Sequence, residues 1–78
     1  MKIKLYTTDN CPFCLAAKNL LSSRNLDFTE INLTNDLDLR LEISTKHNWK
    51  TVPLILIDDK LIGGFDNLKR LNDEGKLL

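Results

Sequence analysis

Long apolar segments are absent from this 78-residue sequence, and the aliphatic run Leu54–Ile57 has only four members. A membrane-spanning helix needs about 20 apolar residues, so we expect no membrane span. The residues after Met1 lack the apolar core of a secretory signal, so we expect a cytoplasmic protein. An excess of one charge is also absent, because eleven Lys and Arg balance eleven Asp and Glu. This balance argues against a nucleic-acid-binding surface and against a disordered charged tail.

Metal-ligating residues are scarce, since the sequence has two cysteines, Cys11 and Cys14, and one histidine, His47. A structural zinc site needs four ligands, so we expect no metal. A disulfide between these cysteines would close a loop of about four residues and contribute roughly 2 kcal/mol, against roughly 3 kcal/mol for about 15 residues. Structural disulfides also rarely persist in the cytoplasm. The pair is therefore expected to react rather than to reinforce the fold.

The short chain has room for one modest core, so we expect a single domain over residues 1–78. Alternating apolar residues predict strands, and apolar residues three or four apart predict helices. The predicted elements are a strand at 2–6, a helix at 12–24, strands at 27–32, 54–57 and 60–62, and a last helix at 66–72. Strand–helix–strand units favour parallel pairing, whereas the short turn Asp58–Asp59 favours a hairpin.

The segment Leu37–Ile43 fits two structures. Its sequence, LDLRLEI, alternates as a half-buried strand does, but it also places apolar residues four apart, as a helix does. Asn35 and Asp36 stand where an N-cap would, and leucine, arginine and glutamate favour helix. A helix over 36–47 would complete the order β-α-β-α-β-β-α, with a four-stranded mixed sheet between helices on both faces.

The cysteine pair lies at the start of a predicted helix, in the sequence NCPFC. Cys11 precedes Pro12, which the first helical position tolerates, and Asp9 and Asn10 are expected to cap the helix. Free N–H groups and the helix dipole favour an anion at this end, so the pKa of Cys11 is expected to be lowered. A lower pKa increases the thiolate fraction but decreases nucleophilicity by a similar factor. The main gain is a better leaving group, which suits a sulfur that enters and leaves mixed disulfides.

Three motifs occur in the order and spacing typical of the glutaredoxin family: Cys11–Cys14 (CPFC), Thr51–Pro53 (TVP) and Gly63–Asp66 (GGFD). The sequence therefore resembles a short bacterial dithiol glutaredoxin over essentially its whole length. The resemblance implies one glutaredoxin-like domain with an α/β, thioredoxin-like fold, and hence a helix at 37–43. It also implies a monomeric, glutathione-dependent thiol–disulfide oxidoreductase with glutathione as co-substrate and no permanent cofactor. The implied partners are disulfide-bearing or glutathionylated proteins, ribonucleotide reductase among them.

The resemblance also assigns roles to individual residues. Cys11 is the expected nucleophile, and Cys14 is the expected resolving cysteine. A cis bond before Pro53 is expected to present the Val52 backbone to an extended substrate, and the glycines of the third motif are expected to let the ligand approach closely. The residues implied to contact glutathione are Phe13, Lys50, Thr51, Val52, Pro53, Gly64, Phe65 and Asp66.

Other side chains near these motifs have less definite expectations. Asp66 is implied to bind the glutathione ammonium and is also expected to cap the last helix. Trp49 is predicted to be a packing residue rather than a ligand contact, and no role is predicted for Glu30. Thr8 stands where the family commonly has a lysine that binds the glycine carboxylate of glutathione, so Lys50 is expected to supply that charge instead.

Two other functions stay open at this point. The lysine missing at Thr8 gives weight to a redoxin that is reduced by thioredoxin reductase and donates electrons to ribonucleotide reductase. Alternatively, two chains could carry one [2Fe–2S] cluster, held by Cys11 of each chain and two glutathiones. Pro12 and Cys14 make the cluster less favourable than in relatives with a single cysteine.

Overall fold

A computed structural model describes residues 1–77 of the chain. The elements follow the predicted order, including a helix in the ambiguous segment. In chain order they are β1 (Ile3–Thr7), α1 (Pro12–Ser23), β2 (Thr29–Asn32), α2 (Leu37–His47), β3 (Leu54–Ile57), β4 (Lys60–Gly63) and α3 (Phe65–Asp73). The predicted boundaries hold to within a residue or two, with the largest difference at β2, which begins at Thr29 instead of position 27.

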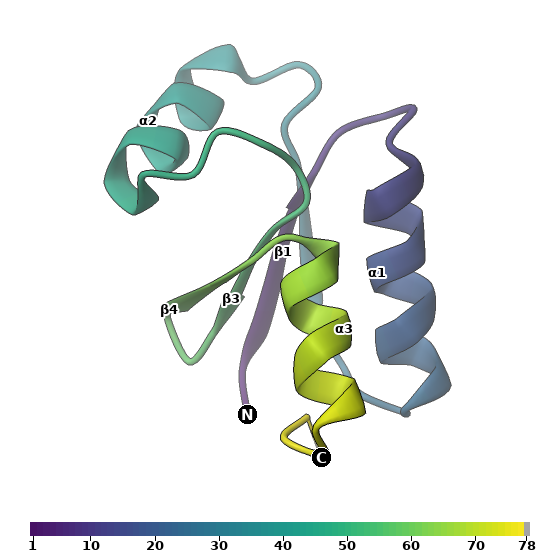
Figure 1. The fold of residues 1–78 in the computed structure, drawn as a ribbon. Coiled ribbons are helices and arrows are strands. Elements are labelled where there is room, and N and C mark those ends of the chain that lie inside the picture. The colour runs from purple at the N-terminus through teal and green to yellow at the C-terminus, as the bar shows by residue number, and fades with distance from the viewer. Residues whose placement is uncertain (78) are drawn as a thin grey trace.

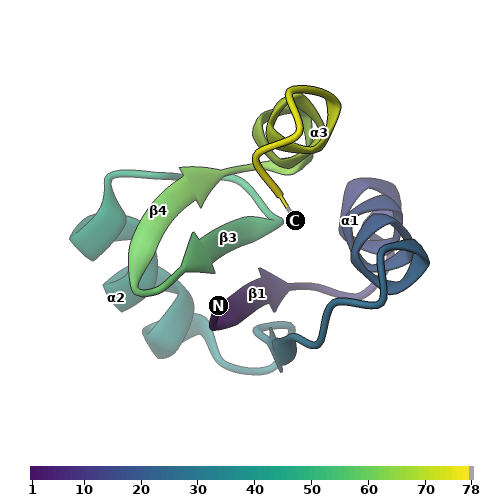
Figure 2. The same ribbon diagram turned by 90° about the horizontal axis from the view of Figure 1, so that it is seen from below.

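The four strands form one mixed sheet in the order β2-β1-β3-β4. β1 pairs with β2 in parallel, while β3 is antiparallel to both β1 and β4. Helices α1 and α3 lie side by side over one face of the sheet, and α2 lies over the other (Figures 1 and 2). The expected architecture, with a four-stranded mixed sheet between helices, is confirmed. No helix within residues 1–77 is both long and apolar enough to cross a membrane.

Each face of the sheet has its own hydrophobic cluster, because successive side chains of a strand point to opposite faces. Leu5 and Ile55 point to the face that α1 and α3 cover. Tyr6, Leu54 and Leu56 point to the other face, where Ile43 of α2 packs. The larger cluster on the α1 and α3 side contains Ile3, Leu5, Ala17, Leu21, Ile55, Leu68 and Leu77.

Helix α2 begins as the N-cap pattern predicted, with Asp36 Oδ1 accepting a hydrogen bond of 3.1 Å from the Leu39 N–H. Because the apolar residues alternate along this helix, they cannot all face the sheet. Ile43 is buried, whereas Leu37 and Leu41 are 66% and 58% exposed. The alternation in LDLRLEI therefore leaves two leucines on the outer surface of a helix.

Three segments that are far apart in the sequence meet at one end of the sheet. They are the start of α1, the loop before β3 and the junction between β4 and α3, and the two chain ends lie at the opposite end (Figure 1). The three motifs CPFC, TVP and GGFD occupy these three segments. The fold therefore brings the motifs together.

Candidate active site

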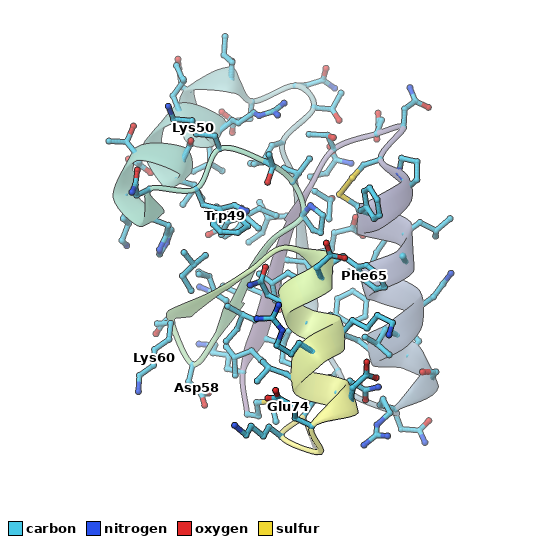
Figure 3. All side chains as sticks on the ribbon, in the orientation of Figure 1. Trp49, Lys50, Asp58, Lys60, Phe65 and Glu74 are labelled. Carbon is cyan, nitrogen blue, oxygen red and sulfur yellow. A yellow bond between two sulfur atoms is a disulfide. The ribbon has the colours of Figure 1, made fainter. Side chains whose placement is uncertain are left out.

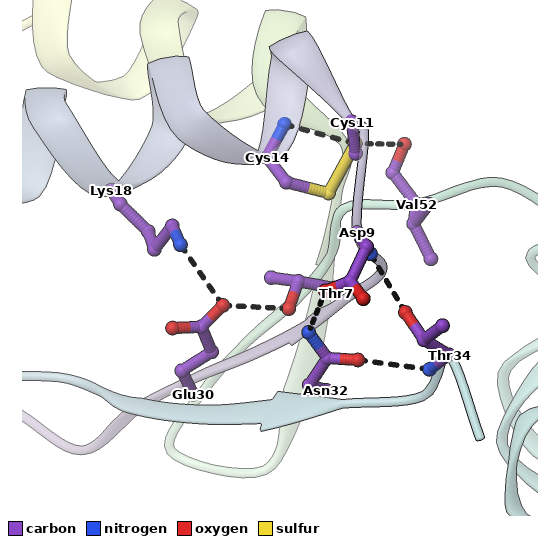
Figure 4. Close-up of a disulfide and its surroundings, with 9 residues drawn as sticks. All are labelled: Thr7, Asp9, Cys11, Cys14, Lys18, Glu30, Asn32, Thr34 and Val52. Atoms are coloured by element: carbon purple, nitrogen blue, oxygen red, sulfur yellow. Dashed lines mark hydrogen bonds and ion pairs between the residues drawn. A yellow bond between two sulfur atoms is a disulfide. The ribbon is translucent and has the colours of Figure 1, made fainter. Parts of the chain in front are cut away.

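Cys11 and Cys14 form a disulfide at the start of α1, with their Cα atoms 5.2 Å apart (Figure 3). Cys11 is itself the N-cap, and its Sγ accepts a hydrogen bond of 3.1 Å from the backbone N–H of Cys14 (Figure 4). The prediction that Asp9 and Asn10 cap this helix is therefore wrong. A free N–H of the first turn is directed at the sulfur instead, which places a hydrogen-bond donor where a Cys11 thiolate would carry its charge.

The two sulfurs differ in their access to solvent. Cys11 is partly exposed, whereas Cys14 is only 2% exposed. The carbonyl oxygen of Val52 lies 3.9 Å from Cys11 Sγ, which in the disulfide carries no hydrogen to donate. The expected cis bond between Val52 and Pro53 is confirmed. Cys11 is therefore the more accessible of the two sulfurs, and the buried Cys14 is bonded directly to it.

Val52, whose carbonyl lies 3.9 Å from Cys11 Sγ, also lines a groove of about 410 Å³, and we call it the aromatic groove. Phe13 and Phe65 stack across α1 and α3, with ring centroids 6.2 Å apart and an interplanar angle of 27°. Phe13 is 61% exposed, so the ring stands at the surface beside the cysteines. The lining residues are Phe13, Trp49, Thr51, Val52, Pro53, Gly64, Phe65, Asp66 and Asn67.

Of the residues implied to contact glutathione, Lys50 is the exception, because it does not line the aromatic groove. Lys50 is exposed and points outward, whereas Trp49 points in toward the sheet (Figure 3). With Arg40, it borders a small crevice behind Thr51 and Val52. Among the described residues that line the groove, Asp66 is the one with a charged side chain.

The start of α3 differs from the prediction that Asp66 caps the helix. The N-cap is Gly64, whose N–H donates a hydrogen bond of 3.1 Å to Asn67 Oδ1. Asp66 is exposed in the first turn, where the helix dipole favours a carboxylate and where its side chain is free to meet a ligand. The Asn67 amide was not recognised from the sequence, although an amide three residues after a helix cap is a known capping signal.

Trp49 was predicted to be a packing residue, and in the structure it both packs against the core and lines the aromatic groove. It packs against the cluster formed by Tyr6, Leu33, Ile43, Leu54 and Leu56, and it also lines the aromatic groove. Its Cζ2 would lie 3.5 Å from a Cβ built on Gly64, so the indole stands against the glycine backbone. No local periodicity marks Trp49 as a groove residue, because its contact with Gly64 joins two distant segments.

A second groove, of about 620 Å³, lies on the other side of the disulfide, and we call it the polar groove. It separates the start of α1 from the edge strand β2. Figure 4 shows the disulfide between Val52 on one side and the pair Lys18 and Glu30 on the other. The residues that line the polar groove are Thr8, Asp9, Asn10, Cys11, Pro12, Cys14, Leu15, Lys18, Glu30 and Asn32.

Side chains from three segments form a hydrogen-bonded network in the polar groove. Glu30 Oε2 accepts from Thr7 Oγ1 at 2.7 Å and from Lys18 Nζ at 3.0 Å (Figure 4). Asp9 is held by Asn32, whose Nδ2 donates to Asp9 Oδ1 at 2.9 Å. The hydrogen bond from Thr7 and then that from Lys18 lower the pKa of Glu30 below its ordinary value of 4.5. The network ties α1 and the loop before Cys11 to β2.

The lowered pKa of Glu30 leads to a prediction about acid stability. A carboxyl group whose pKa is depressed by folding stabilises the protein above the pKa of the unfolded chain, and this stabilisation is lost as the pH falls through the folded pKa. Glu30→Gln should therefore lower the free energy of unfolding near neutrality. We expect less than about 1 kcal/mol, because the side chains of Lys18 and Glu30 are 31% and 33% exposed.

Urea denaturation of the disulfide form at about pH 7 and about pH 3 checks this expectation. The difference between the parent protein and Glu30→Gln should be smaller at the lower pH, because Glu30 takes up a proton as the pH falls through its lowered pKa. A difference of equal size at both values would show that the amide disturbs packing rather than charge.

The comparisons with known proteins agree with this arrangement. The glutaredoxin family model matches residues 3–62. A glutaredoxin of Pseudomonas aeruginosa is 41% identical over 75 residues, covering 96% of this chain and 89% of the relative. The solution structure of a glutaredoxin from Brucella melitensis has a TM-score of 0.86 at 38% identity, covering 99% of this chain and 84% of that one.

A more distant structure shares the fold. The crystal structure of a buckwheat glutaredoxin–glutathione complex has a TM-score of 0.89 at 24% identity, covering 96% of this chain and 71% of that one. The sheet and helices described above are thus those of the thioredoxin-like glutaredoxin fold. With its paired cysteines at the start of α1, the chain belongs to the glutaredoxin family, whose members are thiol–disulfide oxidoreductases.

Proposed function

We propose that this protein uses glutathione to reduce protein disulfides and glutathione mixed disulfides. The observation that carries the proposal is the aromatic groove, which is lined by most of the residues that the family resemblance links to glutathione. One of them is Val52, whose carbonyl oxygen lies 3.9 Å from Cys11 Sγ. A tripeptide thiol lying in this groove would bring its sulfur to the partly exposed Cys11. The buckwheat glutaredoxin that shares the fold is itself in complex with glutathione.

Reduction of a glutathione mixed disulfide needs only Cys11. The Cys11 thiolate attacks the glutathione sulfur, forms a Cys11–glutathione disulfide and expels the substrate as a thiolate, which takes a proton from solvent. A second glutathione thiolate then attacks the bound glutathione sulfur. This step releases glutathione disulfide and restores the Cys11 thiolate, whose departure the N–H of Cys14 assists.

Reduction of a protein disulfide uses both cysteines. Cys11 attacks one sulfur of the substrate, forming a mixed disulfide and expelling the other substrate sulfur as a thiolate. Cys14 then loses its proton and attacks Cys11 Sγ, which releases the remaining substrate sulfur and closes the disulfide seen here. Two glutathiones return the protein to the dithiol and leave as glutathione disulfide, so two electrons pass from glutathione to the substrate.

Charge at the aromatic groove suits the ends of glutathione. The exposed carboxylate of Asp66 suits the ammonium of the γ-glutamyl end, and the free N–H groups at the start of α3 suit the carboxylate beside it. Lys50 lies outside the groove, next to Thr51, where its long side chain is proposed to swing toward the glycine carboxylate. We also propose that the protein acts as a monomer in the cytoplasm, where a reversible dithiol can be kept reduced.

Removing the Asp66 charge tests this assignment. We expect Asp66→Asn to raise the KM for a glutathionylated peptide about three- to tenfold with little change in kcat, since a partly screened ion pair contributes about 1 kcal/mol. The assay uses glutathione and glutathione reductase as the reducing system. Asp73→Asn, at the other end of α3, removes a carboxylate paired with Lys69 at 2.9 Å and should leave the KM unchanged.

The choice of reductant separates the proposal from its rival. Glutathione with its reductase should reduce the oxidised protein rapidly, and thioredoxin reductase should do so slowly. Rapid reduction by thioredoxin reductase alone would overturn the glutathione assignment and favour the redoxin. Equal effects of the Asp66 and Asp73 substitutions on KM would show that Asp66 does not contact the ligand.

A further inference from the structure

We propose that the ion pair of Lys18 and Glu30 sets the balance between the disulfide and dithiol forms of Cys11 and Cys14. In this proposal, Glu30 holds the Lys18 ammonium and limits how far its charge stabilises a cysteine thiolate in the polar groove. The inference rests on the redox function proposed above for the two cysteines. It concerns side chains that line the opposite side of the disulfide from the aromatic groove.

The position of Lys18 on α1 directs it toward the cysteines. Lys18 follows Cys14 by four residues, so the two side chains lie on the same face of the helix. Side chains of a helix lean toward its N-terminus, which carries the Lys18 stem toward Cys14. Both residues line the polar groove, together with Cys11. A lysine in this position is therefore able to act on the sulfurs through its charge.

Glu30 holds Lys18 at the wall of the groove. The carboxylate oxygen that accepts from Lys18 Nζ at 3.0 Å also accepts from Thr7 Oγ1 at 2.7 Å. Thr7 is 1% exposed in β1, so it fixes the carboxylate on a rigid strand. The other charged residue that lines the groove is Asp9, which is held by Asn32. The ammonium thus has its partner on β2 and is not free to turn to a sulfur.

The expected effect on the cysteines follows from the charge of the two redox forms. The disulfide is neutral, whereas the reduced pair can carry a thiolate, so a nearby positive charge stabilises the reduced form and a negative charge opposes it. In the native pair the two charges largely offset each other. Neutralising Glu30 would leave a net positive charge beside the sulfurs, and neutralising Lys18 would leave a net negative charge.

Substitutions at the two positions should therefore shift the redox equilibrium in opposite directions. We expect Glu30→Gln to shift the equilibrium toward the dithiol, and Lys18→Met toward the disulfide, each by about three- to tenfold, where tenfold corresponds to about 30 mV. Gln keeps an oxygen that can accept from Thr7, and Met keeps the apolar stem of Lys18. The equilibrium is measured by alkylation and mass spectrometry in dithiothreitol redox buffers at neutral pH.

Because the dithiothreitol buffer contains no glutathione, the result of this test does not depend on whether the protein binds or uses glutathione. The ultraviolet absorbance of the thiolate, followed against pH, should show its titration at lower pH in Glu30→Gln and at higher pH in Lys18→Met. Thermal unfolding of each oxidised variant verifies folding, and Lys18→Gln replaces Lys18→Met if the latter does not fold. If the ion pair were purely structural, the substitutions would change thermal stability but would shift neither the redox equilibrium nor the thiolate titration.

Two further variants serve as controls. The double variant Lys18→Met with Glu30→Gln should return the equilibrium to within about twofold of the parent, because both charges are gone. Lys69→Met removes the ion pair with Asp73 on α3, which has a similar separation of 2.9 Å but lies outside both grooves, and it should change nothing. Shifts of the two single variants in the same direction, or no shift in either, would overturn the proposal.

Discussion

Replacing Cys11 by serine is expected to abolish the reduction of both glutathione mixed disulfides and protein disulfides. Cys11 is the partly exposed sulfur and stands beside the aromatic groove, whereas Cys14 is 2% exposed. Without the first sulfur, an incoming disulfide therefore meets no thiolate. We expect a loss of at least about 10³-fold in kcat/KM, since a hydroxyl is no nucleophile or leaving group in disulfide exchange at neutral pH.

Cys14→Ser is the matched control for this prediction, because it removes the other sulfur and retains Cys11. This variant should still reduce a glutathionylated peptide, and it should accumulate a Cys11–glutathione disulfide that mass spectrometry detects. Its reduction of a protein disulfide should be lost, because nothing displaces the substrate from Cys11. Full loss of both reactions in Cys14→Ser would contradict the proposed division between the two cysteines.

The strands of the sheet could be predicted from the sequence because their signal is local. In β1, alternation places Leu5 and Tyr6 on opposite faces, and the two hydrophobic clusters follow this pattern. The segment Leu37–Ile43 could not be assigned by the same means. Its alternation fits a strand and its four-residue spacing fits a helix. The N-cap pattern, helix propensity and the family resemblance favoured the helix that the structure contains.

Features that depend on distant contacts could not be predicted. Thr7 and Glu30 are 23 residues apart in sequence, and their hydrogen bond exists only because β1 and β2 pair in a parallel register. Asp9 was expected to cap α1, but the same pairing brings it to Asn32. No local pattern in the sequence contains that register. The role predicted for Asp9 was therefore wrong, and no role was predicted for Glu30.

The motifs predicted most of the aromatic groove, including the charge of Asp66, but the predicted position of the Lys50 charge was wrong. Lys50 is close in sequence to the TVP motif, yet the chain turns so that it lies outside the groove while its neighbour Trp49 lies inside. On the other side of the disulfide, the positive charge in the polar groove is that of Lys18, which is paired with Glu30. Two adjacent residues can differ in this way because they lie in a loop, where no regular periodicity fixes the direction of side chains.

The second large effect is expected for Gly63→Ala. Gly63 has a φ of +123°, a conformation that residues with a side chain rarely adopt, and a Cβ there would lie 2.6 Å from Asn67 Oδ1. Asn67 would have to turn away and lose its hydrogen bond to the Gly64 N–H. Backbone strain and a lost cap together should reduce the free energy of unfolding by about 2–3 kcal/mol. For a domain of this size, that corresponds to a fall of about 10–20 °C in Tm.

Gly64→Ala is the matched control, because it should affect ligand binding in the aromatic groove but not the stability of the fold. Gly64 has an ordinary φ of −102°, and a Cβ there would lie 3.5 Å from Trp49 and 3.7 Å from Pro53. These are normal contact distances, so calorimetry of the oxidised protein should find Gly64→Ala within about 1 kcal/mol of the parent. The added methyl group instead points into the aromatic groove and should raise the KM for a glutathionylated peptide. The prediction would fail if Gly63→Ala were as stable as the parent, since the left-handed backbone at the β4–α3 junction would then not require glycine.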